Sequence, residues 1–139
     1  MKIESEDDLL KKTKAIQTFV DVFGGSFFSL SFNDTDYKVL DKEKNLICYA
    51  EIVIVRSDYS PSEELKVTAN RLVKLSNKRL NPVLIWAFYD GIVYTKVIRL
   101  NGIISWGDRD STQNSYDNQE LVVSFKQNKN FIYEKSIKR

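Results

Sequence analysis

The segment DYKVLDKEKNLICYAEIVIV, residues 36–55, has the pattern of two antiparallel strands joined by a tight turn. Placing the turn at Lys42 to Asn45 brings Asp36 opposite Glu51. The other predicted pairs are Tyr37 with Ala50, Lys38 with Tyr49, Val39 with Cys48, Leu40 with Ile47, and Asp41 with Leu46. The register therefore predicts that one carboxylate from each strand meets the other.

Two carboxylates in directly opposed positions repel each other unless a proton, a cation or water lies between them. A divalent metal is the simplest solution, although acids at a solvated strand end are the commoner case. Glu51 argues for the metal, because it interrupts the apolar run LICYAEIVIV, which is typical of a strand covered on both faces. A buried, unpaired carboxylate would be costly to desolvate. We therefore predict a metal site at Asp36 and Glu51.

Composition limits the other chemistry that is open to the chain. With 139 residues, 42% of them apolar, residues 1–139 suit one domain with its own core. The net charge of +2 does not announce a nucleic-acid binder. The single cysteine, Cys48, excludes an internal disulfide. Together with the absence of histidine, it also excludes the common zinc and Ser/Cys-His sites. No apolar stretch is long enough for a membrane span, so we expect a cytoplasmic protein.

Helices are predicted on both sides of the hairpin. Glu4 to Phe23 is amphipathic, and Gly24-Gly25 would end that helix. The capping residues and the proline between Ser57 and Glu64 predict a second helix that runs to about Arg79.

The remaining segments predict strands and a tail. The strand segments are Ser26 to Phe32, Pro82 to Tyr89, Ile92 to Leu100, Ile103 to Trp106 and Glu120 to Phe125, with a polar loop from Gly107 to Gln119. The basic segment 126–139 is expected to be a mobile tail.

The second predicted helix carries a basic stripe. Lys66, Asn70, Lys74 and Lys78 recur every four residues, with Arg71 beside them. Most such stripes are only solvated faces, but this one lacks alternating acids. It predicts a nucleic-acid contact at Lys66, Asn70, Arg71 and Lys74.

The order helix, strand, Asp-bearing strand, Glu-bearing strand, helix, strand resembles the PD-(D/E)XK nuclease superfamily over roughly Glu4 to Tyr89. The resemblance implies an α+β fold with a single mixed sheet, an αβββαβ restriction-endonuclease-like core and a C-terminal β-hairpin extension. It also implies that Asp36 and Glu51 bind Mg²⁺ or Mn²⁺ and that a lysine two residues after the second acid assists the attacking water. Here that position is Val53, so Lys38 or Lys66 would have to replace the lysine. The later part of the chain is similar to small phage-encoded proteins of this type, which would act in the host cytoplasm.

The resemblance implies that the protein is a metal-dependent nuclease. Its expected partner is nucleic acid, DNA before RNA, and no membrane partner is expected. A homo-oligomer is compatible with the sequence. Two alternatives remain. Val53 favours an inactive nuclease-like fold that binds DNA or a protein. The other is a plain interaction protein, in which aromatic residues such as Trp86 and Trp106 belong to the core.

Overall fold

The computed structural model describes residues 6–30, 35–78, 81–97, 102–108 and 119–136. Helix α1, Glu6–Phe23, confirms the first predicted helix over these residues. The apolar residues of its buried face are Ala15, Ile16, Phe19 and Val20. The chain leaves the helix at Gly24, whose φ of 74° favours a residue without a side chain.

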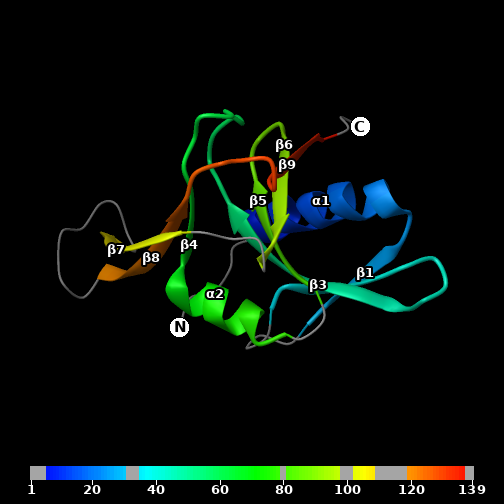
Figure 1. Cartoon of the computed structure of the whole chain (residues 1–139). Coiled ribbons are helices and arrows are strands. Elements are labelled where there is room, and N and C mark those ends of the chain that lie inside the picture. The colour runs from blue at the N-terminus through cyan, green and yellow to red at the C-terminus, as the bar shows by residue number, and fades with distance from the viewer. Residues whose placement is uncertain (1–5, 31–34, 79–80, 98–101, 109–118, 137–139) are drawn as a thin grey trace.

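A six-stranded mixed sheet forms the centre of the molecule, in the order β1-β2-β3-β5-β6-β9 (Figure 1). Its strands are β1 (Ser26–Ser29), β2 (Tyr37–Leu40), β3 (Leu46–Ile54), β5 (Pro82–Ala87), β6 (Gly91–Lys96) and β9 (Ile132–Lys135). Strand β3 pairs antiparallel with β2 and parallel with β5. It is therefore the strand at which the sheet changes direction.

The predicted hairpin register is confirmed from Tyr37 to Val39, which face Ala50 to Cys48. It is wrong at Leu40, which pairs with Leu46 because the register shifts after Val39. A β-bulge places one extra residue on one strand of a pair. The predicted pairs beyond the bulge therefore hold, whereas the pair nearer the turn is shifted by one residue.

The second predicted helix is wrong in its first half. Residues Leu65–Thr68 form strand β4, and helix α2 runs only from Ala69 to Ser76, while residue 79 lies outside the described residues. Leu65 and Val67 are buried whereas Lys66 between them is exposed, and this alternation is that of a strand. Pairing with β8 overrides the helix-start signals before it.

The prediction of a single sheet is also wrong. Strands β7 (Ile103–Asp108) and β8 (Gln119–Phe125) join β4 in a second, three-stranded sheet of order β4-β8-β7. The predicted loop overlaps both strands at its ends, and its residues 109–118 lie outside the described part. The fold is thus α+β, with a six-stranded mixed sheet, a small second sheet and two described helices.

The segment expected as a mobile tail instead contributes a strand. Residues Ile132–Lys135 form β9, which pairs antiparallel with β6 at the edge of the large sheet. The ring of Tyr133 stacks on Tyr59, with centroids 4.0 Å apart and an interplanar angle of 15°. The segment thus contains apolar side chains that pack against the sheet, although its overall composition is basic.

Each face of the large sheet is covered by its own core. The core on the α1 side includes Phe19, Val39, Ala50, Ile52 and Ile85, among others. The core on the α2 side includes Leu65, Leu75, Leu84, Trp86 and Phe125. Along β3, side chains alternate between these cores, so Glu51 points to the face that α2 covers.

Candidate functional site

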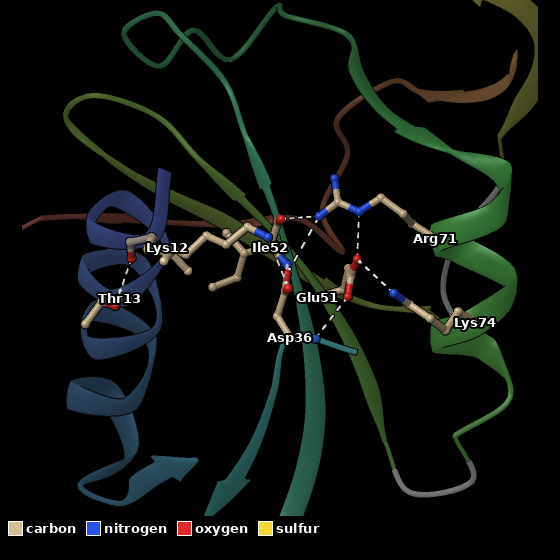
Figure 2. Close-up of polar contacts among 8 residues, drawn as sticks. Lys12, Thr13, Asp36, Glu51, Ile52, Arg71 and Lys74 are labelled. Carbon is tan, nitrogen blue, oxygen red and sulfur yellow. Dashed lines mark hydrogen bonds and ion pairs between the residues drawn. The ribbon is translucent and has the colours of Figure 1, made fainter. Parts of the chain in front are cut away.

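The structure brings the two predicted acids together at the centre of the large sheet (Figure 2). Asp36 directly precedes β2, and Glu51 lies in the middle of β3. The backbone N–H of Asp36 donates to Oε1 of Glu51 at 3.1 Å. Oδ2 of Asp36 in turn accepts from the backbone N–H of Ile52 at 2.8 Å. The carboxylates are therefore fixed to the two strands by backbone donors.

Basic side chains from both helices converge on these acids (Figure 2). From α2, Nε of Arg71 lies 2.6 Å from Oε2 of Glu51, and Nζ of Lys74 lies 4.0 Å from the same oxygen. From α1, Nζ of Lys12 lies 3.1 Å from Oδ1 of Asp36. A second nitrogen of Arg71 lies 3.7 Å from Oδ2 of Asp36. We call these five side chains the charge cluster; two acids and three bases give it a formal charge of +1.

The most deeply buried member of the charge cluster is Glu51, whose side chain is 3% exposed, against 20% for Asp36. Burial, and to a lesser degree the nearby charge of Asp36, raise the pKa of Glu51, whereas Arg71 and Lys74 lower it. Removal of a carboxylate from water disfavours its charged form. The basic residues of α2 therefore offset part of a desolvation cost that β3 imposes.

The two lysines expected to assist catalysis lie elsewhere. Lys38 projects from β2 toward the ring of Phe28, with Nζ 5.8 Å from its centroid. Lys66 lies on β4 and is exposed. Within the described part of the chain, neither lysine has a hydrogen bond or ion pair with Asp36 or Glu51. The basic partners that the structure gives the two acids are therefore residues other than these lysines.

The expected basic stripe does not form as one helix face, because Lys66 precedes the helix. Asn70 is exposed in the first turn of α2. Arg71 and Lys74 instead turn inward to Glu51, and Nζ of Lys78 lies 4.7 Å from the ring centroid of Tyr49, which is on β3 like Glu51. Arg71 and Lys74, three residues apart, lie on one face of α2, and Lys78 follows the end of the helix.

Sequence reasoning missed Lys12. This lysine is only 8% exposed, and it precedes Ala15 and Ile16 by three and four residues on the buried face of α1. A lysine on the apolar face of a helix is almost never fully buried unless it is paired. That position was the available signal for an acidic partner in the core.

The donor chemistry of the site fits a divalent cation such as Mg²⁺, which prefers oxygen ligands. Three oxygens surround the Arg71 guanidinium: Oε2 of Glu51, Oδ2 of Asp36 and the backbone carbonyl of Ile52, which accepts a hydrogen bond from Arg71. Among the described residues, no group of three or more acidic or thiol side chains is arranged so that it could hold a metal ion. A metal here would therefore need the Ile52 carbonyl and water beside the two carboxylates.

Two findings bear on the setting of this site. Among the described helices, none combines the length and apolarity needed to cross a membrane. Comparisons of the chain with protein families, with curated proteins and with solved structures found no match.

Proposed function

We propose that the protein is a metal-dependent nucleic-acid phosphodiesterase of the PD-(D/E)XK type. One observation carries this proposal: the carboxylates of Asp36 and Glu51, 15 residues apart, and the carbonyl of Ile52 all contact the same guanidinium, that of Arg71. The order α1, β1, β2, β3, α2, β5, with β3 and β5 parallel, agrees with the αβββαβ arrangement, if β4 is taken as an insertion before α2.

The reaction would be hydrolysis of a phosphodiester. The oxygen of a water molecule bonds to phosphorus, the bond from phosphorus to the leaving oxygen breaks, and that oxygen takes up a proton. Asp36, Glu51 and the Ile52 carbonyl would hold Mg²⁺ or Mn²⁺. When bound, such an ion polarises the phosphate and makes the attacking water more acidic.

The lysine missing from position 53 is replaced, in our proposal, by Lys74. Val53 packs against the core on the α2 side, so a lysine there would lose an apolar contact. Nζ of Lys74 lies 4.0 Å from Oε2 of Glu51, yet the side chain is 36% exposed. It is therefore both near the acids and open to a phosphate group from solvent. Its role would be to stabilise the negative charge that builds up on the phosphate.

A cleavage assay tests this proposal. Purified protein is incubated with end-labelled single-stranded and duplex DNA and RNA, with Mg²⁺, with Mn²⁺ and with EDTA. We expect cleavage that needs the metal and that falls by at least about 100-fold in Glu51→Gln, since each such group stabilises the transition state by several kcal/mol. Lys38→Gln serves as the control and should cut normally. Cleavage that persists in EDTA or in Glu51→Gln would contradict the proposal.

A second function is favoured by the pairing inside the charge cluster. Each carboxylate already has a basic partner, and position 53 carries valine, so the fold is suited to binding nucleic acid or a protein without chemistry. Binding to labelled duplex that weakens steeply with salt, with no cleavage product in either metal, would select this function.

A further inference from the structure

Arg71 occupies the place that a metal ion would take. Its guanidinium contacts Oε2 of Glu51 at 2.6 Å, Oδ2 of Asp36 at 3.7 Å and the carbonyl of Ile52 (Figure 2). One planar cation thus binds an oxygen from each of three groups, two side chains and one backbone carbonyl. These are the same three oxygens that the proposed metal site requires.

We propose that Arg71 and a divalent cation compete for these three oxygens, so that the metal binds only when Arg71 moves away. This inference rests on the proposed function for the existence of the metal site, and it adds a built-in competitor for that site. In the absence of metal, Arg71 keeps the two carboxylates close together without leaving a buried, unpaired charge.

Distances and charge both make the two occupants exclusive. Magnesium binds oxygen at about 2.0–2.1 Å and needs nearly ideal octahedral geometry. The Arg71 guanidinium contacts Oε2 of Glu51, Oδ2 of Asp36 and the Ile52 carbonyl together, so an ion held by all three oxygens at once would overlap it. With Arg71, Lys12 and Lys74 all in place, the charge cluster already carries +1. A divalent ion about 4 Å from one of these cations would be strongly repelled at low effective dielectric.

Arg71 is able to leave, whereas the other tightly held groups are not. Its side chain is 31% exposed and comes from α2, while Lys12 is 10% and Glu51 3% exposed. The long side chain can therefore rotate toward solvent without unfolding the sheet. In that position the guanidinium is free to bind a phosphate oxygen, for which its planar fork is well suited.

Binding of Mn²⁺ by the full chain tests the competition without any cleavage. The affinity is measured by titration calorimetry and by loss of the free Mn²⁺ resonance signal. The variants are Arg71→Met, Arg71→Gln, which keeps hydrogen-bond donors near Glu51, and Lys74→Met, which removes the same charge from the same helix. Thermal unfolding shows which variants are folded.

We expect both Arg71 variants to bind Mn²⁺ at least about tenfold more tightly than the unmodified protein, and Lys74→Met to gain much less. If Arg71→Met does not fold, Arg71→Gln alone decides the outcome. Equal affinities in the unmodified protein and in the Arg71 variants would overturn the competition and leave the metal site intact. An equal gain in Lys74→Met would reduce it to general charge repulsion and overturn it as well. No binding by any form, at millimolar Mn²⁺, would overturn both this inference and the proposed enzyme.

Discussion

Nε of Arg71 lies 2.6 Å from Oε2 of Glu51, and this contact joins α2 to the middle strand of the large sheet. Glu51 is flanked on β3 by residues of the apolar cores, so its carboxylate has little access to water. The positive charge of Arg71 therefore stabilises the Glu51 carboxylate in place of water. The same contact defines the resting state of the proposed site, in which the acids are held together by a side chain.

The pKa of Glu51 gives a prediction with a definite sign. Its pKa is raised above the ordinary value of 4.5 by burial and by Asp36. The folded protein therefore holds the Glu51 proton more tightly than the unfolded chain, and the free energy of unfolding falls as pH rises from 4.5 to the folded pKa. In Glu51→Gln this contribution is absent. Guanidinium denaturation from pH 4 upward should show the native protein losing stability relative to Glu51→Gln; a relative gain with rising pH would contradict the direction.

Lys12 is expected to matter for stability because its removal leaves Asp36 without its nearest cation. Both side chains are largely buried, at 10% and 20% exposure. Lys12→Met should lower the free energy of unfolding by about 2–4 kcal/mol. The control is Lys11→Met, which breaks a pair with the exposed Asp7 one helical turn away and a contact with the ring of Tyr89, and should change stability by no more than about 1 kcal/mol. Urea denaturation compares the two; equal losses would mean that the Lys12 pair adds nothing special.

Lys74 is the basic residue that the proposed reaction needs. Lys74→Gln should lower the rate of metal-dependent cleavage by about 100-fold, the range typical for loss of a charge-stabilising group. The control is Lys78→Gln, two residues beyond the end of α2, whose amine lies 4.7 Å from the ring centroid of Tyr49. Steady-state rates on one labelled substrate measure the difference. A similar loss in both variants would indicate a general effect on binding of the backbone.

The strand at the C-terminal edge predicts a third stability effect. Tyr133 stacks on Tyr59 and makes a hydrogen bond to the carbonyl of Asp90 at 3.4 Å. Tyr133→Ala should cost about 1–3 kcal/mol, because it removes an aromatic contact and opens a gap beside β6. The neighbouring Ile132 is 46% exposed, so Ile132→Ala should cost less than about 1 kcal/mol. Thermal and chemical unfolding of both variants would show whether β9 belongs to the stable core.

The hairpin could be predicted from sequence because the alternation of side chains along a strand depends only on local sequence. Once the turn is placed, alternation assigns Glu51 its partners without further information, and this holds from Tyr37 to Val39. The shift at Leu40 could not be predicted, since a bulge depends on how the strand end packs. The basic side chains that pair with the two acids could not be predicted either, because they are distant in sequence. Arg71 lies 20 residues from Glu51, and Lys12 lies 24 residues from Asp36.

The error in the second helix has a physical cause. Ser60, Pro61 and the acids after them are good helix-start signals, but they are local signals. Leu65 and Val67 form a strand because β8, more than 50 residues later, offers a pairing edge and a core to fill. Tertiary pairing of this kind overrides propensity. The predicted helix therefore began too early in the chain, and the prediction did not show that Arg71 and Lys74 lie on the helix face that contacts Glu51.

A crystal structure of the protein soaked with Mn²⁺, with anomalous scattering recorded for manganese, tests the proposed metal site most directly. We predict one anomalous peak bounded by Oδ2 of Asp36, Oε2 of Glu51 and the carbonyl of Ile52, with the Arg71 side chain turned away from all three. Manganese bound only at other places, with Arg71 still on Glu51 at saturating metal, would contradict the account.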